Sequence, residues 1–271
     1  MERVIDSKSC RDIGKLTGVE RSLDREREIF VIRNKLRNSA GRRRLGILWL
    51  VLDPVAMSLV YLFVLTVVRS YPNFESLFIG VSMFRILQAS FMSGVNSIQD
   101  FTGGLISERV RSRVLVSAAM KYRILEATFQ SSGISVILLF GLGVNSRAVI
   151  AFIILSQIMG ILVEGVALNM SKLVRRIPDF SNLTRYFMLL MFFGSPALYP
   201  MAMTTGLHYR INEYNPFSYF VESVRYLAGL DSVIFELSGT LALLMATLLL
   251  LLTFRGYASI DGLRWEVSSW S

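Results

Sequence analysis

The chain has 271 residues, of which 53% are hydrophobic, and its mean hydropathy is +0.50. Such a composition excludes an ordinary soluble domain of this length, and repeated apolar runs of bilayer length predict a polytopic membrane protein. The formal net charge of +9 could indicate nucleic-acid binding, but most Lys and Arg lie between the apolar runs and no DNA- or RNA-binding motif accompanies them.

The N-terminal segment, residues 1–46, is polar and basic. Ser22 can cap a helix in which Ile29, Ile32 and Leu36 share one face. This pattern is typical of a helix that lies in the membrane interface with its basic groups toward lipid phosphates. A solvated cytosolic tail is the alternative. No cleavable signal peptide precedes the first apolar run, so we expect that run to direct insertion.

Six apolar runs follow, each long enough to cross a hydrocarbon core of about 30 Å. They cover residues 47–68, 77–98, 124–144, 148–170, a run that begins near 186, and 233–254. We therefore predict an all-α polytopic fold with six transmembrane helices. The predicted regions are a cytosolic segment with an interface helix (1–46), a six-helix transmembrane domain (47–255) and a cytosolic tail (256–271).

The distribution of basic residues predicts the orientation. With both termini inside, the inner segments hold 24 Lys and Arg, whereas the outer segments hold 4 and one more, Arg85, lies within the second run. Under the positive-inside rule this bias places both termini in the cytoplasm. We expect the protein in a prokaryotic plasma (inner) membrane.

Charged residues that stand inside the apolar runs include Asp53, Arg85, Glu126 and Glu164. A charge in the hydrocarbon region costs at least about 2.5–3.5 kcal/mol, so each needs a partner or a function. They either pair between helices or line a polar path for a substrate. Their small number argues against a proton or sodium relay.

A loop between the second and third runs combines two glycines with charge. Gly103 and Gly104 precede the stretch 105–113, which holds Glu108 and three arginines. On the cytosolic side, this loop suits docking onto a soluble protein. Its arginines also fit simple positive-inside anchoring.

The fifth run is broken by helix-disrupting residues. Residues 192–200 read FFGSPALYP, and Pro196 and Pro200 each remove a backbone donor. Irregular backbone at membrane depth occurs where it packs in protein or lines a wet cavity. This segment is therefore a candidate for a functional site.

The segment after the fifth run begins with Asn215 and Pro216 and continues as a short apolar stretch, 218–230. Thirteen residues are too few to span, which predicts a re-entrant segment. Aromatic rings can stack on the apolar faces of sugars, but they also form belts at membrane interfaces. The aromatic residues concerned are Tyr199, Tyr209, Tyr214, Phe217, Tyr219, Phe220 and Tyr226.

Motifs for catalysis are missing from the sequence. There is no GxSxG or HExxH, and Gly14-Lys15 is followed by Leu16 rather than by the Ser or Thr of a phosphate-binding loop. Cys10 and His208 are the only residues of their types, which leaves few ligands for a metal. We predict no catalytic residue, no metal site and no cofactor in this chain, so active transport would need ATP hydrolysis by a partner.

Three sequence patterns together resemble the permease subunits of type 2 ABC exporters, particularly those that export polysaccharides. Residues 45–54, LGILWLVLDP, follow a basic segment and are similar to that family's LGxLWxxLxP. Residues 195–200, SPALYP, are similar to its SPxxYP element. Asn215 and Pro216, followed by Arg225, resemble its NP…R element.

The resemblance implies a homodimer that sits on two copies of a P-loop ABC ATPase subunit, which binds ATP and Mg²⁺. It implies that residues 22–44 form an interface helix, that 103–115 couple to the ATPase, and that 217–230 are re-entrant. The implied substrate is a lipid-linked polysaccharide such as O antigen, capsule or a teichoic-type polymer. Membrane lipids are the remaining expected partners, and nucleic acid is not expected.

The residues expected to form the functional parts fall into three groups. The substrate channel would be lined by Tyr61, Arg85, Phe192, Phe193, Tyr199, Phe217 and Tyr219. Coupling to the ATPase would use Arg33, Leu105, Ser107, Glu108, Arg109 and Arg111. The external re-entrant motif would consist of Asn215, Pro216 and Arg225. Arg85 could also favour an anionic polymer.

Two other functions compete with this hypothesis. A type 2 ABC permease for drugs or lipids would share the fold, and a large outer domain would favour it. A membrane-embedded lipid-linked sugar transferase would need acidic or His-rich cytosolic motifs, which the sequence does not show.

Overall fold

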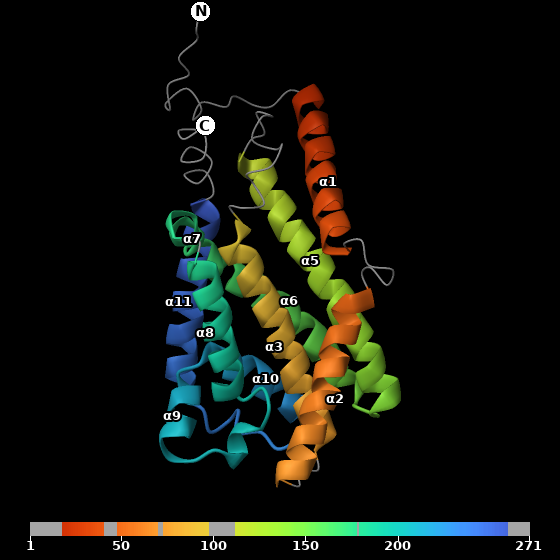
Figure 1. Ribbon diagram of the computed structural model, residues 1–271, viewed down its shortest axis with the longest axis vertical. Coiled ribbons are helices and arrows are strands. Elements are labelled where there is room, and N and C mark those ends of the chain that lie inside the picture. The colour runs from red at the N-terminus through yellow and green to blue at the C-terminus, as the bar shows by residue number, and fades with distance from the viewer. Residues whose placement is uncertain (1–17, 41–47, 70–72, 98–111, 178, 260–271) are drawn as a thin grey trace, which may run out of the picture.

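The computed structural model describes residues 18–40, 48–69, 73–97, 112–177 and 179–259, and these residues form helices and connecting turns without any strand (Figure 1). The helices are α1 (Gly18–Ala40), α2 (Trp49–Arg69), α3 (Phe74–Val95), α5 (Ser112–Val136), α6 (Ser146–Leu168), α7 (Ser171–Arg176), α8 (Phe180–Gly194), α9 (Gly206–Glu213), α10 (Pro216–Leu227) and α11 (Gly239–Ala258). α5 continues into a π-helix, η2 (Ile137–Gly141), and a 3-10 turn, η3 (Met201–Met203), precedes α9.

Four of these helical segments are long and apolar enough to cross a membrane: Phe74–Val95, Val116–Gly141, Ser146–Leu168 and Gly239–Ala258. The described apolar part of α2 is shorter, Val51–Val64. α8 has 15 residues, or about 22 Å of helix, because the helix ends before Pro196. The multi-pass fold is thus confirmed, while the count of six spans stays a prediction.

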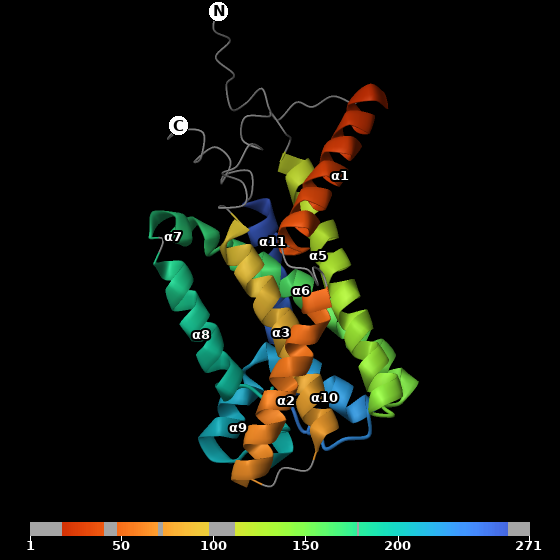
Figure 2. The same cartoon turned by 45° about the vertical axis from the view of Figure 1, so that its right-hand side comes forward.

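The helices form one bundle around α3. α3 packs against α2 and α6, and α6 also contacts α5, α10 and α11. Figures 1 and 2 both place α1 and α7 toward one end of the bundle and α9 at the other. We call these the inner end and the outer end, after the predicted orientation.

The core is built on the outer half of α3. Residues 76–84 of α3 are all buried, so this stretch has no solvent- or lipid-facing side. Phe152 and Met159 of α6, Met188 of α8 and Val221 of α10 pack against it. A helix buried on every side explains why this run shows no amphipathic pattern.

α1 packs on α5 through Val31, and Ile32, one of the three residues on the predicted apolar face, is partly buried beside it. The structure buries Val31 beside Val114 and Ala118 of α5, whereas Ile29 is 48% exposed. Glu28 also accepts a hydrogen bond from Ser117 of α5. The expected helix within residues 22–44 is present over 18–40, and residues 41–44 lie outside the described residues. Its position relative to a membrane interface stays a prediction.

The start of the last helix corrects a predicted boundary. The sixth run was expected to be helical from residue 233, but α11 begins at Gly239, where Ser238 caps the helix by accepting a hydrogen bond from Leu241 N. Val233 and Leu237 instead pack against Met201. Apolar residues in this segment therefore fill the outer end of the bundle rather than extending the span.

α11 and α6 cross closely near the inner end. The backbone at Gly256 lies so near the Gly165 carbonyl that a Cβ at Gly256 would overlap it. Thr253 Oγ1 donates to Leu162 O at 2.9 Å, and Asn169 Nδ2 donates to Leu252 O at 2.9 Å. Small residues that admit close backbone approach are typical of helix crossings in membranes.

Candidate functional site

The turn that follows α8 is buried at the outer end of the bundle. α8 ends at Gly194, and Ser195 takes an extended conformation with ψ 164°. Ser195, Pro196, Ala197 and Leu198 are all buried, as is Pro200 at the end of the turn. This irregular backbone is thus enclosed by protein, which is the condition under which it is tolerated at membrane depth.

α10 begins at the Asn-Pro pair. Asn215 caps the helix by accepting a hydrogen bond from Phe217 N at 3.1 Å, and Pro216 occupies the first turn, where its missing N–H is harmless. One side of the helix is buried through Phe217, Val221 and Val224. At 12 residues α10 cannot span a bilayer, and its re-entrant placement stays a prediction.

Glu222 and Arg225 form a fully buried ion pair on α10. Arg225 Nη1 lies 2.9 Å from Glu222 Oε1, and both side chains have 0% exposure. Removing two charges from water is costly unless each also finds further hydrogen bonds. Further hydrogen bonds are therefore expected around the pair.

The pair is bonded to the backbone of several other segments. Arg225 donates to Tyr199 O at 3.3 Å and to Ser76 O of α3 at 3.1 Å. Glu222 accepts from Met201 N and from Val233 N, each at 3.2 Å. The SPALYP turn, α3, η3 and the segment after α10 thus meet at two side chains. We call this group the outer clamp.

Gly80 lets the turn approach α3 this closely. A Cβ at Gly80 would overlap Ala197 O and crowd the Arg225 guanidinium. The glycine is required by this contact rather than by its backbone angles. The SPALYP and NP…R elements named from the sequence are therefore parts of one buried arrangement.

A smaller polar group lies on the exposed side of the turn. His208 Nε2 lies 2.6 Å from Tyr199 Oη and 3.2 Å from Gly194 O. Because a carbonyl can only accept, Nε2 carries the proton, and the Tyr199 hydroxyl donates to Phe193 O at 3.1 Å.

The aromatic residues expected in a channel separate into exposed and buried sets. Tyr61 of α2 packs on Phe192 and Phe193 of α8, with ring centroids 4.9 Å and 6.2 Å away. Phe193 is exposed, whereas Phe192 and Phe217 are buried against Phe84. Tyr61 and Phe193 can therefore meet a molecule on the α2–α8 face of one protomer.

Tyr219, the last aromatic of the expected channel, lies at the outer end. It is partly buried, and its hydroxyl donates to Glu213 O at 3.0 Å. Tyr219 therefore ties α10 to the end of α9.

Arg85 has partners within the chain. It forms an ion pair with Asp53 of α2 and donates to Gln88 Oε1 at 2.7 Å. This ion pair joins α2 and α3, as expected if the charges in the apolar runs pair between helices rather than line a substrate path. Arg85 is still 26% exposed, so part of the guanidinium remains accessible.

The other two intramembrane charges lie toward the inner end: Glu126 has an ionic partner, and Glu164 has two hydrogen-bond donors. Glu126 lies 2.7 Å from Arg123, three residues earlier on α5. Glu164 of α6 accepts hydrogen bonds from Ser93 of α3 and Tyr257 of α11, both at 3.2 Å. We call Ser93, Arg123, Glu126, Glu164 and Tyr257 the inner cluster. Within it, the hydrogen bonds of Glu164 connect α3, α6 and α11.

A family model for ABC-2 type transporters matches residues 28–228. The chain belongs to the ABC-2 type transporter family. No individual curated protein matches it. This ABC-2 transporter is therefore a multi-pass membrane permease, and permeases of the family normally pair with an ATPase subunit. The matched region contains the outer clamp residues of α3, the turn and α10, whereas α11 lies beyond it.

The expected coupling residues of this ABC-2 permease are only partly described. Arg33 is exposed on α1. Leu105, Ser107, Glu108, Arg109 and Arg111 lie outside the described residues. α5 begins directly after them, at Ser112. Its early part is joined to α1 by Lys121, which lies 2.9 Å from Glu28.

Several residues of the site were not foreseen. Glu222, Arg123 and Tyr257 each bind one of the charged groups that the sequence singled out. Glu222 and Arg225 share the i,i+3 spacing of a helical ion pair, as do Arg123 and Glu126, so that spacing was the available signal. Within the described chain there is no cluster of three His, Cys, Asp or Glu that could hold a metal.

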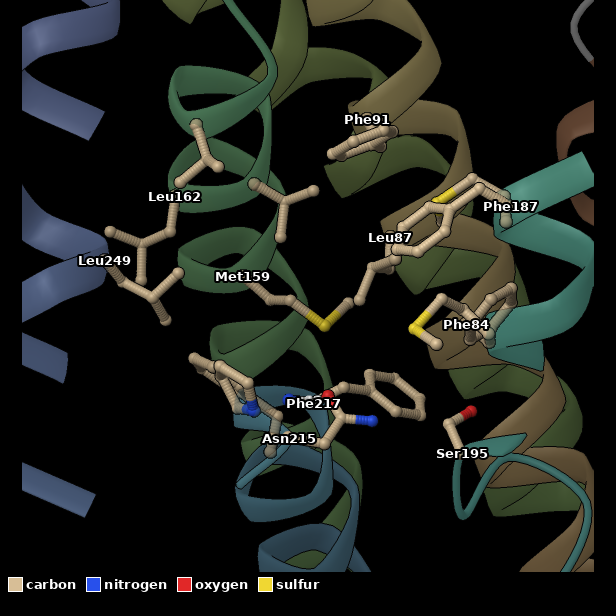
Figure 3. Close-up of a pocket in the computed structure, with 16 residues that line it drawn as sticks. Phe84, Leu87, Phe91, Met159, Leu162, Phe187, Ser195, Asn215, Phe217 and Leu249 are labelled. Atoms are coloured by element: carbon tan, nitrogen blue, oxygen red, sulfur yellow. Dashed lines mark hydrogen bonds between the residues drawn. The ribbon is translucent and has the colours of Figure 1, made fainter. Parts of the chain in front are cut away.

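An apolar cavity of about 260 Å³ lies among α3, α6, α8, α10 and α11 (Figure 3). Except for Ser195 and Asn215, its lining side chains are apolar. Figure 3 places these two residues toward one end and Phe91 toward the other. Such a cavity does not suit a polysaccharide, which needs many polar partners.

Proposed function

We propose that this permease exports a lipid-linked polysaccharide, such as O antigen, capsule or a teichoic-type polymer, across a prokaryotic plasma membrane. Two copies of the chain would form the channel, and two copies of a P-loop ABC ATPase would bind ATP and Mg²⁺ beneath it. Both termini would lie in the cytoplasm. The chain would couple ATP hydrolysis to movement without hydrolysing ATP itself.

The observation that supports this proposal best is an exposed aromatic face on α8. Tyr186, Leu190 and Phe193 follow one another at helical spacing and are 70%, 67% and 52% exposed. Tyr61 of α2 lies beside Phe193. Rings presented in a row offer a sugar chain many weak stacking contacts, and their hydroxyls can bond to its edges.

The same face supports a channel between two copies. α2 also has exposed apolar side chains, and these include Leu59, Val60 and Phe63. A monomer exposes this apolar area to lipid, whereas a dimer could enclose it as a path. In that arrangement Arg85 and Asp53 would add polar groups beside the aromatic face.

A permease for drugs or lipids is the second candidate. The apolar cavity favours it, because a largely apolar lining suits a hydrophobic ligand. The two candidates share the fold and the ATPase, so they are separated by what stimulates ATP hydrolysis and what crosses the membrane.

The decisive experiment is co-purification with a P-loop ABC ATPase subunit, followed by reconstitution into vesicles. ATP hydrolysis should rise with the lipid-linked polymer, and deletion of the chain should remove surface polysaccharide. Stimulation by lipophilic drugs or phospholipids alone, with surface polysaccharide intact, would contradict the proposal and favour the second candidate.

A variant pair tests the aromatic face directly. The double change Tyr186→Leu and Phe193→Leu keeps the face apolar and removes its rings, so polymer export should fall while the complex still assembles. Phe140→Leu with Phe235→Leu is the matched control, because both rings are 80% exposed away from this face. Equal export by the two double variants would show that export does not depend on the rings of the aromatic face.

A further inference from the structure

The apolar cavity lies between two helices that pack on different neighbours. α8 contacts α3, whereas α11 contacts α6, and Figure 3 shows α8 and α11 on opposite sides of the cavity. Phe187 of α8 lines the cavity and is 49% exposed. The cavity wall therefore continues onto the outer surface of the helix bundle.

The surroundings restrict what can fill this space. α3, α6 and α11, which line it, are long and apolar enough to cross a membrane, so we expect hydrocarbon at its mouth. Apolar cavities do not hold water: one of roughly 150 Å³ stays dry and accepts benzene. The present cavity is larger, at about 260 Å³.

A protein helix does not fit the cavity, but a flexible chain does. A helix with its side chains is about 10 Å across, which is wider than the space can admit. Met159, Met188 and Met191 line it, and methionine side chains adjust to irregular apolar shapes. A linear hydrocarbon chain is the ligand that matches this lining.

We propose that the cavity binds one acyl chain of a membrane phospholipid, which enters between α8 and α11. The proposal assigns the cavity to a lipid that stays bound rather than to the transported polymer, because its lining contains no charged group and little polar surface. The bound chain fills the space between two helices and so supports α11 against the bundle.

The test uses the full chain in vesicles of phosphatidylethanolamine and phosphatidylglycerol that contain no polysaccharide. A trace phospholipid with a photoreactive group in the middle of one acyl chain is cross-linked, and the labelled residues are mapped by mass spectrometry. We expect labelling at Met159, Met188 and Leu249 to exceed that at exposed Leu244 and at other lipid-facing positions.

Filling the cavity should abolish that excess. In Val163→Phe, labelling of the lining residues should fall about tenfold because the new ring occupies the chain's volume. Ile154→Phe is the matched control, since it adds the same ring to the exposed side of α6. Leu249→Phe fills the cavity from α11 and replaces Val163→Phe if that variant elutes as aggregate. Labelling that simply follows exposure, or that survives both filling variants, would overturn the proposal.

Discussion

At the outer end of the bundle, Glu222 and Arg225 hydrogen-bond to backbone groups of four other segments. Near the inner end, Glu164 is held by two hydroxyl groups, those of Ser93 and Tyr257. Both sites bury charge, but their partners differ in mobility. A backbone group moves only with its whole segment, whereas a hydroxyl can rotate to another acceptor.

This difference assigns the two ends different mechanical roles. The outer clamp fixes the SPALYP turn, α10 and α3 as one unit. In the inner cluster Arg123 has an ionic partner on its own helix, and its Nε has no hydrogen-bond partner among the described residues. Contacts of that kind can exchange when helices slide, which the proposed function would require if an ATPase drives the permease from its inner end.

The largest expected effect comes from breaking the outer clamp. Arg225→Met leaves Glu222 buried without its counter-charge, which should lower the free energy of unfolding by about 3–5 kcal/mol. Thermal unfolding in detergent measures the change. Arg210→Met, on the exposed surface of α9, is the control and should stay within about 0.5 kcal/mol. Similar melting of both variants would show that the clamp does not stabilise the fold.

A smaller effect is expected from crowding the same contact. Gly80→Ala places a methyl group against Ala197 O, and overpacking of this kind costs about 1–3 kcal/mol. Gly194→Ala is the control, because a Cβ there meets nothing within 4 Å. The same unfolding assay compares the two. An unperturbed Gly80→Ala protein would mean that the turn can shift away from α3.

The inner cluster should respond more in transport than in stability. Tyr257→Phe removes one hydrogen bond to Glu164 while Ser93 keeps the other, so unfolding should change by about 1 kcal/mol. We expect a lower ratio of polymer exported to ATP hydrolysed. Tyr226→Phe on exposed α10 surface is the control. An unchanged ratio in Tyr257→Phe would argue that the inner cluster does not move during transport.

The smallest stability effect is expected where α1 meets α5. Lys121→Met breaks an exposed contact with Glu28, which is worth less than about 1 kcal/mol. Glu28→Gln and the double variant complete a mutant cycle. A coupling energy well above that range, measured by unfolding, would show that α1 is held as firmly as the outer clamp.

Apolar run length predicted the membrane fold but not every boundary. α5 begins at Ser112, well before the predicted start at 124, because the charged residues that precede the apolar run pack against α1 or inside the bundle. α11 begins later than predicted because Val233 is used for packing at the outer end. Hydropathy alone cannot tell whether an apolar residue meets lipid or another segment.

The sequence motifs of the site could be predicted, but the contacts between them could not. SPALYP and Asn215-Pro216 with Arg225 stood out as elements, yet their meeting through Glu222 depends on contacts far apart in the chain. Phe192 and Phe217 were expected in a channel and are buried in the protomer instead. Residue type indicated aromatic chemistry, but only the packing showed which rings are accessible.

The close crossing at Gly165 and Gly256 gives α11 the properties of a lever. Thr253 and Gly256, both near the inner end, are its buried residues. The helix has 20 residues and is therefore about 30 Å long. The arm from Gly256 to Gly239 is about 25 Å, so a tilt of about 5° at this pivot would carry the far tip roughly 2.2 Å sideways. A slight rotation of α6 would thus produce a larger displacement at the outer end of α11. The space between α8 and α11 would widen or narrow with that displacement.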